Sequence, residues 1–157
     1  AVERLVKAGA VHLLLMNLPD LGAIPETLGT AEAAPATEFT VNFNAALANL
    51  IDRFSAEYPQ VNFYEFDVAA QFVDVRADPA AYGFVNVSEP SPNFAVADNF
   101  DGANYAFWDE IHPTTQMHAL IADRVYADLQ SQVPDMTPET EDDSSDVTCF
   151  IDTLWDD

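Results

Sequence analysis

Residues 11–16 read Val-His-Leu-Leu-Leu-Met, a short apolar run that decides how the rest of the chain can fold. A run of this length and composition is typical of a strand buried on both faces, as in a parallel sheet covered by helices. Residues 61–66, Val-Asn-Phe-Tyr-Glu-Phe, predict a second strand. Between the two strands, a core-facing stripe with spacings of three and four predicts a long helix over residues 38–58. The stripe consists of Phe39, Phe43, Leu47, Leu50, Phe54 and Tyr58.

Further periodic segments continue this alternation of strands and helices. A short helix is expected over residues 2–8, and a third helix capped by Asp67 is expected to end before Pro79. Residues 80–106 lack periodicity and are predicted to be irregular. The last helix is expected to begin at a cap formed by Thr114 or Thr115. The buried sides predicted for the third and last helices are Val68, Phe72 and Val75, and Met117, Leu120, Ile121, Val125 and Leu129. This order predicts an α/β fold in which a parallel sheet is sandwiched by helices.

The charge balance excludes several classes of partner. The chain carries 27 acidic and 5 basic residues, for a formal net charge of −22. Because so few positive charges could neutralise phosphates, we expect no nucleic-acid partner and no docking to an anionic membrane surface. No apolar run approaches the roughly 18–20 residues that span a bilayer, so no membrane span is expected. Cys149, the single cysteine, excludes an intrachain disulfide.

The acid excess also bears on stability. A chain with 27 acids and one lysine, Lys7, is typical of proteins adapted to high salt, although a secreted acidic protein or an acidic tail would also explain it. If high salt is the reason, screening of the self-repulsion should raise the midpoint of thermal unfolding as NaCl increases into the molar range. Unfolding followed by circular dichroism across a salt series measures this midpoint. A value that stays constant or falls would contradict the high-salt interpretation.

Residues 107–114, Phe-Trp-Asp-Glu-Ile-His-Pro-Thr, place an acid three residues before a histidine at the mouth of the last helix. This spacing lets the carboxylate of Asp109 reach the imidazole of His112, and Pro113 fixes the exit of the loop. An imidazole held by a carboxylate makes up two thirds of the triad of a nucleophilic hydrolase. The alternative is an exposed turn that contains the two residues by chance.

Four landmarks resemble, in the same order, blocks of the SGNH, or GDSL-type, esterases and lipases. They are the loop Asn-Leu-Pro-Asp-Leu-Gly with a later proline at residues 17–25, Phe43-Asn44, Tyr-Gly-Phe-x-Asn-Val at residues 82–87, and Asp-x-x-His-Pro-Thr at residues 109–114. The match is with the lipase and phospholipase branch and covers about residues 5–130. It implies a flavodoxin-like SGNH hydrolase fold from which the N-terminal portion is missing.

The resemblance also implies roles for the residues of the motif. His112 would act as general base towards a serine, and Asp109 would hold the ring through its other nitrogen. Independently, loops that leave the carboxyl ends of parallel strands build ligand sites, so Asn17, Pro19 and Asp20 are candidate substrate-binding residues. The implied substrate is an acyl ester or a lipid, and neither a cofactor nor a metal is expected.

The chain departs from the family pattern at the nucleophile. Neither Gly-Asp-Ser nor Gly-x-Asn-Asp occurs, and no serine stands at a turn after a strand. We therefore expect a serine ester hydrolase of which this chain supplies the His–Asp part and is inactive alone. The other hypothesis is a non-catalytic acidic binding domain derived from the same fold.

Three other features of the sequence are weaker candidates for a functional site. His12 is predicted to be a core histidine. A zinc site formed by Asp109, His112 and His118 lacks a further ligand at a usual spacing. The acidic segment at residues 98–104 is similar to a calcium loop but lacks the first and twelfth carboxylates.

The domain boundary is expected near residue 133. Residues 1–133 would form the C-terminal portion of the hydrolase domain, and residues 134–157, with nine acids and no base, an acidic and flexible tail. A half-sheet leaves an unpaired strand edge, so an N-terminal half or a second copy is the expected protein partner. By family analogy the protein would be secreted or periplasmic.

Overall fold

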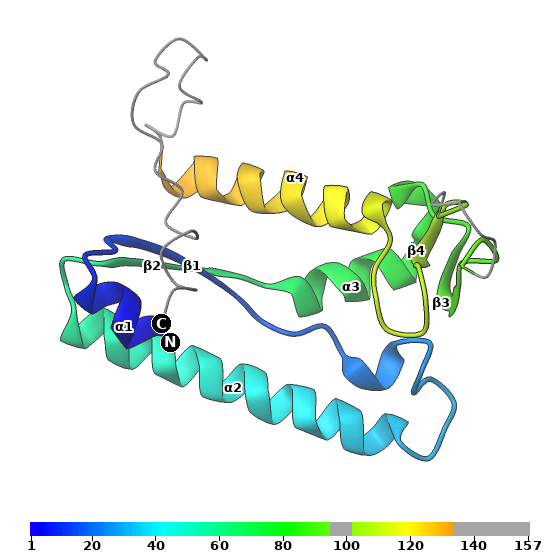
Figure 1. Cartoon of the computed structure of the whole chain (residues 1–157), viewed down its shortest axis with the longest axis horizontal. Coiled ribbons are helices and arrows are strands. Elements are labelled where there is room, and N and C mark those ends of the chain that lie inside the picture. Colours follow the sequence, from blue (N-terminus) through cyan, green and yellow to red (C-terminus); the bar gives the residue numbers. More distant parts are fainter. Residues whose placement is uncertain (95–101, 134–157) are drawn as a thin grey trace, which may run out of the picture.

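The computed structural model describes residues 1–94 and 102–133, which form alternating helices and short parallel strands (Figure 1). The elements in chain order are α1 (Val2–Lys7), β1 (His12–Met16), η1 (Leu21–Ala23), α2 (Ala33–Glu57), β2 (Asn62–Phe66), α3 (Val68–Ala77), η2 (Pro79–Tyr82), β3 (Asn86–Pro90), β4 (Tyr105–Phe107) and α4 (Thr115–Gln132). The prediction of an α/β fold with parallel strands is confirmed. The predicted tail at residues 134–157 and most of the calcium-like segment lie outside the described residues.

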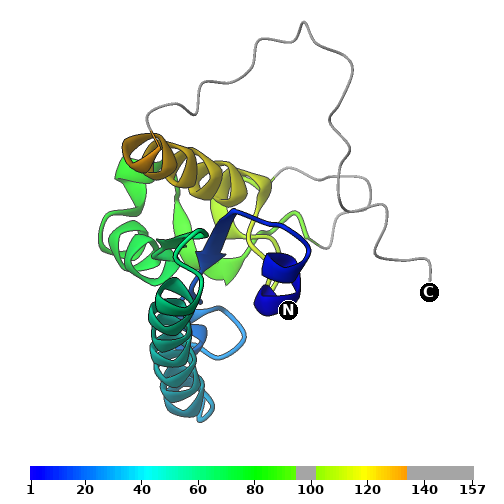
Figure 2. The ribbon, with the colours of Figure 1, turned by 90° about the vertical axis from the view of Figure 1, so that its left-hand side faces the viewer.

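The parallel pair β1–β2 lies between two long helices. The register joins His12 to Asn62 and continues to Met16 and Phe66. Figures 1 and 2 show α4 on one side of this pair and α2 on the other. Both strands run in the same direction and α2 connects them, so the prediction of parallel strands with a long helix between them is confirmed.

The prediction that β1 is buried on both faces is wrong. Exposure alternates along the strand, with Leu14 at 37% and Met16 at 51%, whereas Leu13 and Leu15 are half-buried. A strand is covered only where another layer reaches it, and α4 contacts β2 but leaves an open cavity beside His12 and Leu14. An apolar strand face therefore remains exposed on this part of the chain.

The predicted core stripe of α2 is only partly confirmed. Phe54 is buried, whereas Phe39 is 57% exposed and Phe43 is also exposed. In the N-terminal half of the helix the buried residue is Thr40, which was not in the predicted stripe. The helix also begins five residues earlier than predicted, because Pro35 falls in its first turn, where proline is tolerated. It ends before Pro59 as expected.

The helix α3 follows the prediction closely. The side chain of Asp67 accepts a hydrogen bond from the backbone N–H of Ala70 and caps the helix. Val68, Phe72 and Val75 are buried, as their spacing indicated.

The prediction of an irregular segment over residues 80–106 is wrong in part. This segment contains η2, β3 and the start of β4, and the two strands pair in parallel with an irregular register. The strands are short and contain asparagine and proline, so that sequence periodicity gave no signal for them.

The main hydrophobic core lies where α3, α4 and β4 meet. The helix α4 is capped by Thr114, whose hydroxyl accepts a hydrogen bond from the backbone N–H of Met117 at 3.2 Å. Met117 is fully buried, and Leu120, Ile121 and Val125 pack against the core from the same helix. The buried members of this core are Ile24, Phe66, Val68, Phe72, Val75, Phe84, Ala106, Phe107 and Met117. Among the described residues no helix is long and apolar enough to cross a membrane.

Candidate active site

A short turn carries the predicted dyad from β4 to α4. The backbone N–H of Trp108 donates to the carbonyl of His112 at 2.7 Å, and that of Thr114 donates to the carbonyl of Ala106 at 2.9 Å. Phe107 and Pro113 form an antiparallel bridge across the same turn. Because Phe107 and Thr114 at its two ends are buried, the turn is anchored to the hydrophobic core.

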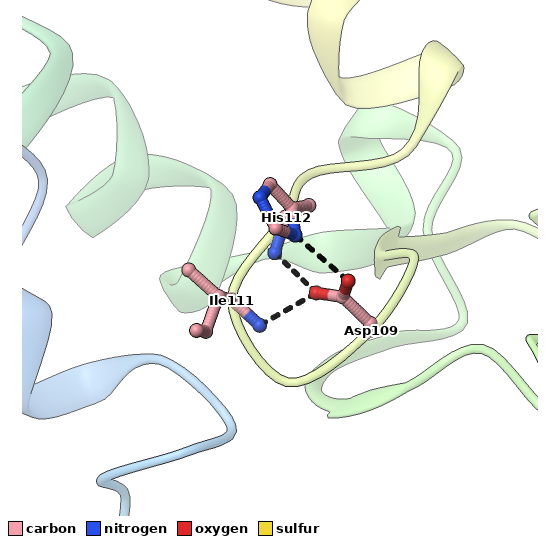
Figure 3. Close-up of polar contacts among 3 residues, drawn as sticks. All are labelled: Asp109, Ile111 and His112. Atoms are coloured by element: carbon pink, nitrogen blue, oxygen red, sulfur yellow. Dashed lines mark hydrogen bonds and ion pairs between the residues drawn. The ribbon is translucent and has the colours of Figure 1, made fainter.

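Asp109 organises this turn with both carboxylate oxygens (Figure 3). Its Oδ1 accepts hydrogen bonds from the backbone N–H groups of Ile111 at 2.8 Å and His112 at 2.6 Å. Its Oδ2 lies 2.7 Å from Nδ1 of the His112 ring. The carboxylate therefore holds the backbone and the imidazole of the same residue at once.

The electrostatics favour an ionised carboxylate at this position. Partial burial acts to raise the pKa of Asp109, but the two backbone hydrogen bonds and the contact with the His112 ring outweigh it and hold the pKa below its ordinary value. An ionised carboxylate can only accept, so Nδ1 of neutral His112 carries the proton and Nε2 carries the lone pair. Since the His112 side chain is 72% exposed and that of Asp109 only 23%, Nε2 faces the solvent.

The lowered pKa links the order of the turn to pH. A carboxyl group whose pKa is lower in the folded state stabilises that state above its unfolded pKa of about 3.9. The contribution is lost as the pH falls through the lower folded-state value. Between pH 5 and 8 the carboxylate therefore remains ionised and keeps its three hydrogen bonds.

Replacing Asp109 with asparagine is expected to weaken the preference of the His112 ring for the Nδ1–H tautomer. The amide can still accept from one backbone N–H, but it no longer offers an anionic acceptor to Nδ1, so the Nε2–H form should increase. The ¹⁵N chemical shifts of the imidazole nitrogens report this change directly. Asp123→Asn, which removes an exposed acid from α4, is the matched control and should leave the shifts unchanged. Identical ring shifts in the wild type and Asp109→Asn would contradict the assignment.

The three predicted substrate-binding residues lie in a loop whose polar side chains bond within the protein. The side chain of Asn17 donates to Oδ1 of Asp67 at 2.7 Å and accepts from the backbone N–H of Ala69 at 3.0 Å. Oδ1 of Asp20 accepts from the backbone N–H of Gly22 and from the hydroxyl of Thr37. These contacts tie the loop to α2 and α3, and their role towards a substrate stays a prediction.

This loop also braces the turn that carries the dyad. The backbone N–H of Glu26 donates to the carbonyl of Glu110 at 3.0 Å. Asn44 on α2 holds the loop from the other side, because its amide bonds both the N–H and the carbonyl of Leu18. Sequence reasoning noted Phe43-Asn44 as a landmark but missed this contact, which joins segments 26 residues apart.

Within the described residues, neither of the other two histidines is hydrogen-bonded to Asp109 or to the His112 ring. His12 is exposed, and its Nδ1 lies 3.1 Å from the hydroxyl of Tyr64, so the prediction of a core histidine is wrong. It is exposed because it falls on the uncovered face of β1. His118 is exposed on α4. Within residues 1–94 and 102–133, no three His, Cys, Asp or Glu side chains are grouped as a metal site.

No serine in the described part of the chain is hydrogen-bonded to His112. Ser91 is buried and its hydroxyl accepts from the backbone N–H of Asn93, while Ser131 donates to a backbone carbonyl of α4. The described residues thus bring together an acid and an imidazole, with the free ring nitrogen directed to the solvent.

A comparison against known families identifies the family of the chain. The model for the GDSL-like lipase/acylhydrolase family matches residues 1–125, and the chain belongs to this family. A GDSL esterase/lipase from Arabidopsis thaliana is 25% identical over 80% of the chain and 37% of its own length. The phosphatidylcholine-sterol acyltransferase of Aeromonas hydrophila is 25% identical over 84% of the chain and 52% of its length. The thermolabile hemolysin of Vibrio parahaemolyticus is 28% identical over 80% of the chain and 34% of its length. The aligned part of the chain thus spans about a third to a half of each of these relatives.

Proposed function

We propose that this chain is the part of a serine ester hydrolase that supplies the general base, His112, and its partner Asp109. The observation that carries the proposal is the 2.7 Å contact between Nδ1 of His112 and Oδ2 of Asp109, with Nε2 open to the solvent. Membership of the GDSL-like lipase/acylhydrolase family supports the reaction class. The proposed substrates are carboxylic esters or lipid acyl esters.

The geometry suits the steps of acyl transfer. Nε2 of His112 would take the proton of a serine hydroxyl as its oxygen attacks the ester carbonyl, and a tetrahedral oxyanion forms. Asp109 would stabilise the imidazolium through Nδ1–H. The imidazolium would then protonate the leaving alcohol, which leaves an acyl-enzyme. Water, deprotonated by the same ring, would release the acid and regenerate the serine.

The nucleophile would come from a segment outside this chain. Gly-Asp-Ser is absent from its sequence, and the relatives are two to three times as long as the part that aligns. The proposed source of the nucleophile is an N-terminal half of the hydrolase domain. A second copy of the chain carries no Gly-Asp-Ser either, so it is proposed only as an alternative partner for the exposed edge of the sheet. The exposed apolar face of β1 supports an additional layer there, since parallel sheets are normally covered on both faces.

The 157-residue chain is expected to hydrolyse p-nitrophenyl butyrate no faster than buffer, because acyl-enzyme formation needs the absent serine. Turnover should appear when a hydrolase segment that contains Gly-Asp-Ser is refolded together with the chain. That turnover should be lost in His112→Ala and retained in His118→Ala, which removes an exposed imidazole from α4, the helix that follows the turn.

Two outcomes would contradict this proposal. Turnover by the chain alone that His112→Ala abolishes would show that a nucleophile is present after all. If the chain assembles correctly with the segment that contains Gly-Asp-Ser and the complex is inactive, the alternative function would be favoured, a non-catalytic acidic binding domain on the same fold. The absence of Gly-Asp-Ser is the observation that keeps this alternative open.

Domain limits and location are part of the same proposal. Residues 1–133 would form the hydrolase part, and the 24 residues that follow would form an acidic extension. By analogy with the family, the protein would be secreted or periplasmic.

A further inference from the structure

A cavity of about 400 Å³ lies between the loop that follows β1 and the helix α3. Its volume is in the range of small-molecule sites, roughly 300–1,000 Å³. One basic residue and five apolar residues make up most of its lining: Arg76, and Ala23, Leu28, Ala69, Phe72 and Val73. Leu28 and Val73 are exposed at its surface, so the cavity opens to solvent along an apolar wall.

Arg76 has spare hydrogen-bonding capacity in this cavity. Its Nη1 donates to the backbone carbonyl of Ala23 at 2.8 Å, which positions the guanidinium at the loop. Within the part of the chain that the structure describes, Arg76 makes no ion pair, although the sequence contains 27 acids. The carboxylate of Asp20, the acid in the lining, is held instead by Gly22 and Thr37. A guanidinium has five N–H donors in a planar fork, so most of them remain available to a ligand.

We propose that this cavity binds the anion of a medium-chain fatty acid. The guanidinium of Arg76 would hold the carboxylate through two parallel N–H···O bonds, and the apolar side chains would cover the alkyl chain. A half-buried guanidinium without an ion-pair partner among the described residues, beside an apolar wall, is complementary to an anionic amphiphile. An acyl chain without a charged end would provide no carboxylate for the guanidinium, which would then have no ion-pair partner, just as in the described part of the ligand-free protein.

The cavity is connected to the candidate active site through two contacts. Phe72 lines the cavity, and the centroid of its ring lies 5.9 Å from the ring centroid of Phe107 at the start of the turn. The loop that forms the other wall donates from Glu26 to the carbonyl of Glu110. A fatty acid is the product of acyl-ester hydrolysis, so the biological sense of this site rests on the proposed function. Binding to the isolated chain does not depend on hydrolysis.

The net charge sets the conditions of the test. A formal charge of −22 repels any anion at long range, but at 1 M NaCl the Debye length falls to about 3 Å and this repulsion is screened. The short-range contact between the Arg76 guanidinium and the ligand carboxylate is supported by apolar burial, so salt weakens it less than it weakens the long-range repulsion. Decanoate, used below its micelle concentration in 1 M NaCl, is therefore the probe, and decanol is its uncharged counterpart.

Isothermal titration of the 157-residue chain with decanoate should give saturable binding at one site. Arg76→Gln should weaken decanoate binding by about tenfold or more, as expected for the loss of a charge-assisted bidentate contact. Arg53→Gln is the matched control, because it removes an exposed arginine from α2, and it should leave the affinity unchanged. Ala69→Leu, which fills the cavity and keeps Arg76, should also weaken binding. Circular dichroism confirms that each variant is folded.

The outcomes distinguish specific binding at this site from non-specific hydrophobic binding, and they test the site separately from the proposed hydrolase function. Equal affinities for decanoate in Arg76→Gln and Arg53→Gln, equal binding of decanol and decanoate, or no binding would each overturn the site. Loss in Arg76→Gln and Ala69→Leu but not in Arg53→Gln would support it. A failure here would leave the His112 experiment unaffected, and an inactive assembled pair would leave decanoate binding unaffected.

Discussion

Truncation of Met117 to alanine is expected to reduce the free energy of unfolding by about 2–5 kcal/mol, the usual range for removing a buried methionine side chain. Met117 has no exposed surface and stands in the first turn of α4, where it joins the core formed by α3, β4 and the loop after β1. The cavity left by the side chain would lie directly behind the turn that carries the dyad. Urea unfolding, followed by far-ultraviolet circular dichroism, measures the loss.

The chain offers a control with the same chemical change. Met16→Ala removes a methionine side chain that is 51% exposed on β1, so the expected loss is about 0.5 kcal/mol or less. If both substitutions destabilised the protein equally, the packing described around α4 would be wrong.

Gly22→Ala is expected to have the second large effect. A Cβ atom at this position would overlap the hydroxyl of Thr37 and the backbone carbonyl of Ala33 at the start of α2. The carbonyl belongs to a helix and cannot rotate away, so that the loop or the helix must shift. Overpacking typically costs about 1–3 kcal/mol, and with backbone as the obstacle we expect the upper end of this range or more. The free energy of unfolding and the apparent thermal midpoint would both fall.

Gly29→Ala provides the comparison for Gly22→Ala. Gly29 has a positive φ of 79°, but a Cβ there would meet no atom within 4 Å. Its replacement should therefore cost only the roughly 1–2 kcal/mol of a left-handed backbone conformation. A Gly22→Ala protein as stable as Gly29→Ala would show that the close approach of the loop to α2 does not occur in solution.

Local patterns in the sequence predicted local structure well. The three-residue spacing of Asp109 and His112 predicted their contact, and the structure shows it together with two backbone hydrogen bonds that the spacing alone does not reveal. The caps at Asp67 and Thr114 were also predictable, because a side chain that accepts from an N–H three residues later is a local device.

Burial was less predictable, since it depends on neighbouring elements. The periodicity of α2 identified residues that share a face but not what would cover that face, and Phe39 and Phe43 are exposed. The same reason explains the uncovered face of β1. The contact of Asn44 with Leu18 and that of Glu26 with Glu110 join distant segments, so no local pattern could predict them. The catalytic role of the dyad stays a prediction until activity is reconstituted.

The apolar face of β1 has a consequence for how the protein behaves in concentrated solution. Copies that each carry 22 excess negative charges repel one another in dilute buffer. This repulsion keeps the exposed side chains of β1, such as Leu14 and Met16, from contacting those of another copy. Added salt removes that barrier at the same concentrations at which it relieves repulsion within each molecule. Colloidal solubility and conformational stability of this chain should therefore respond to ionic strength in opposite directions.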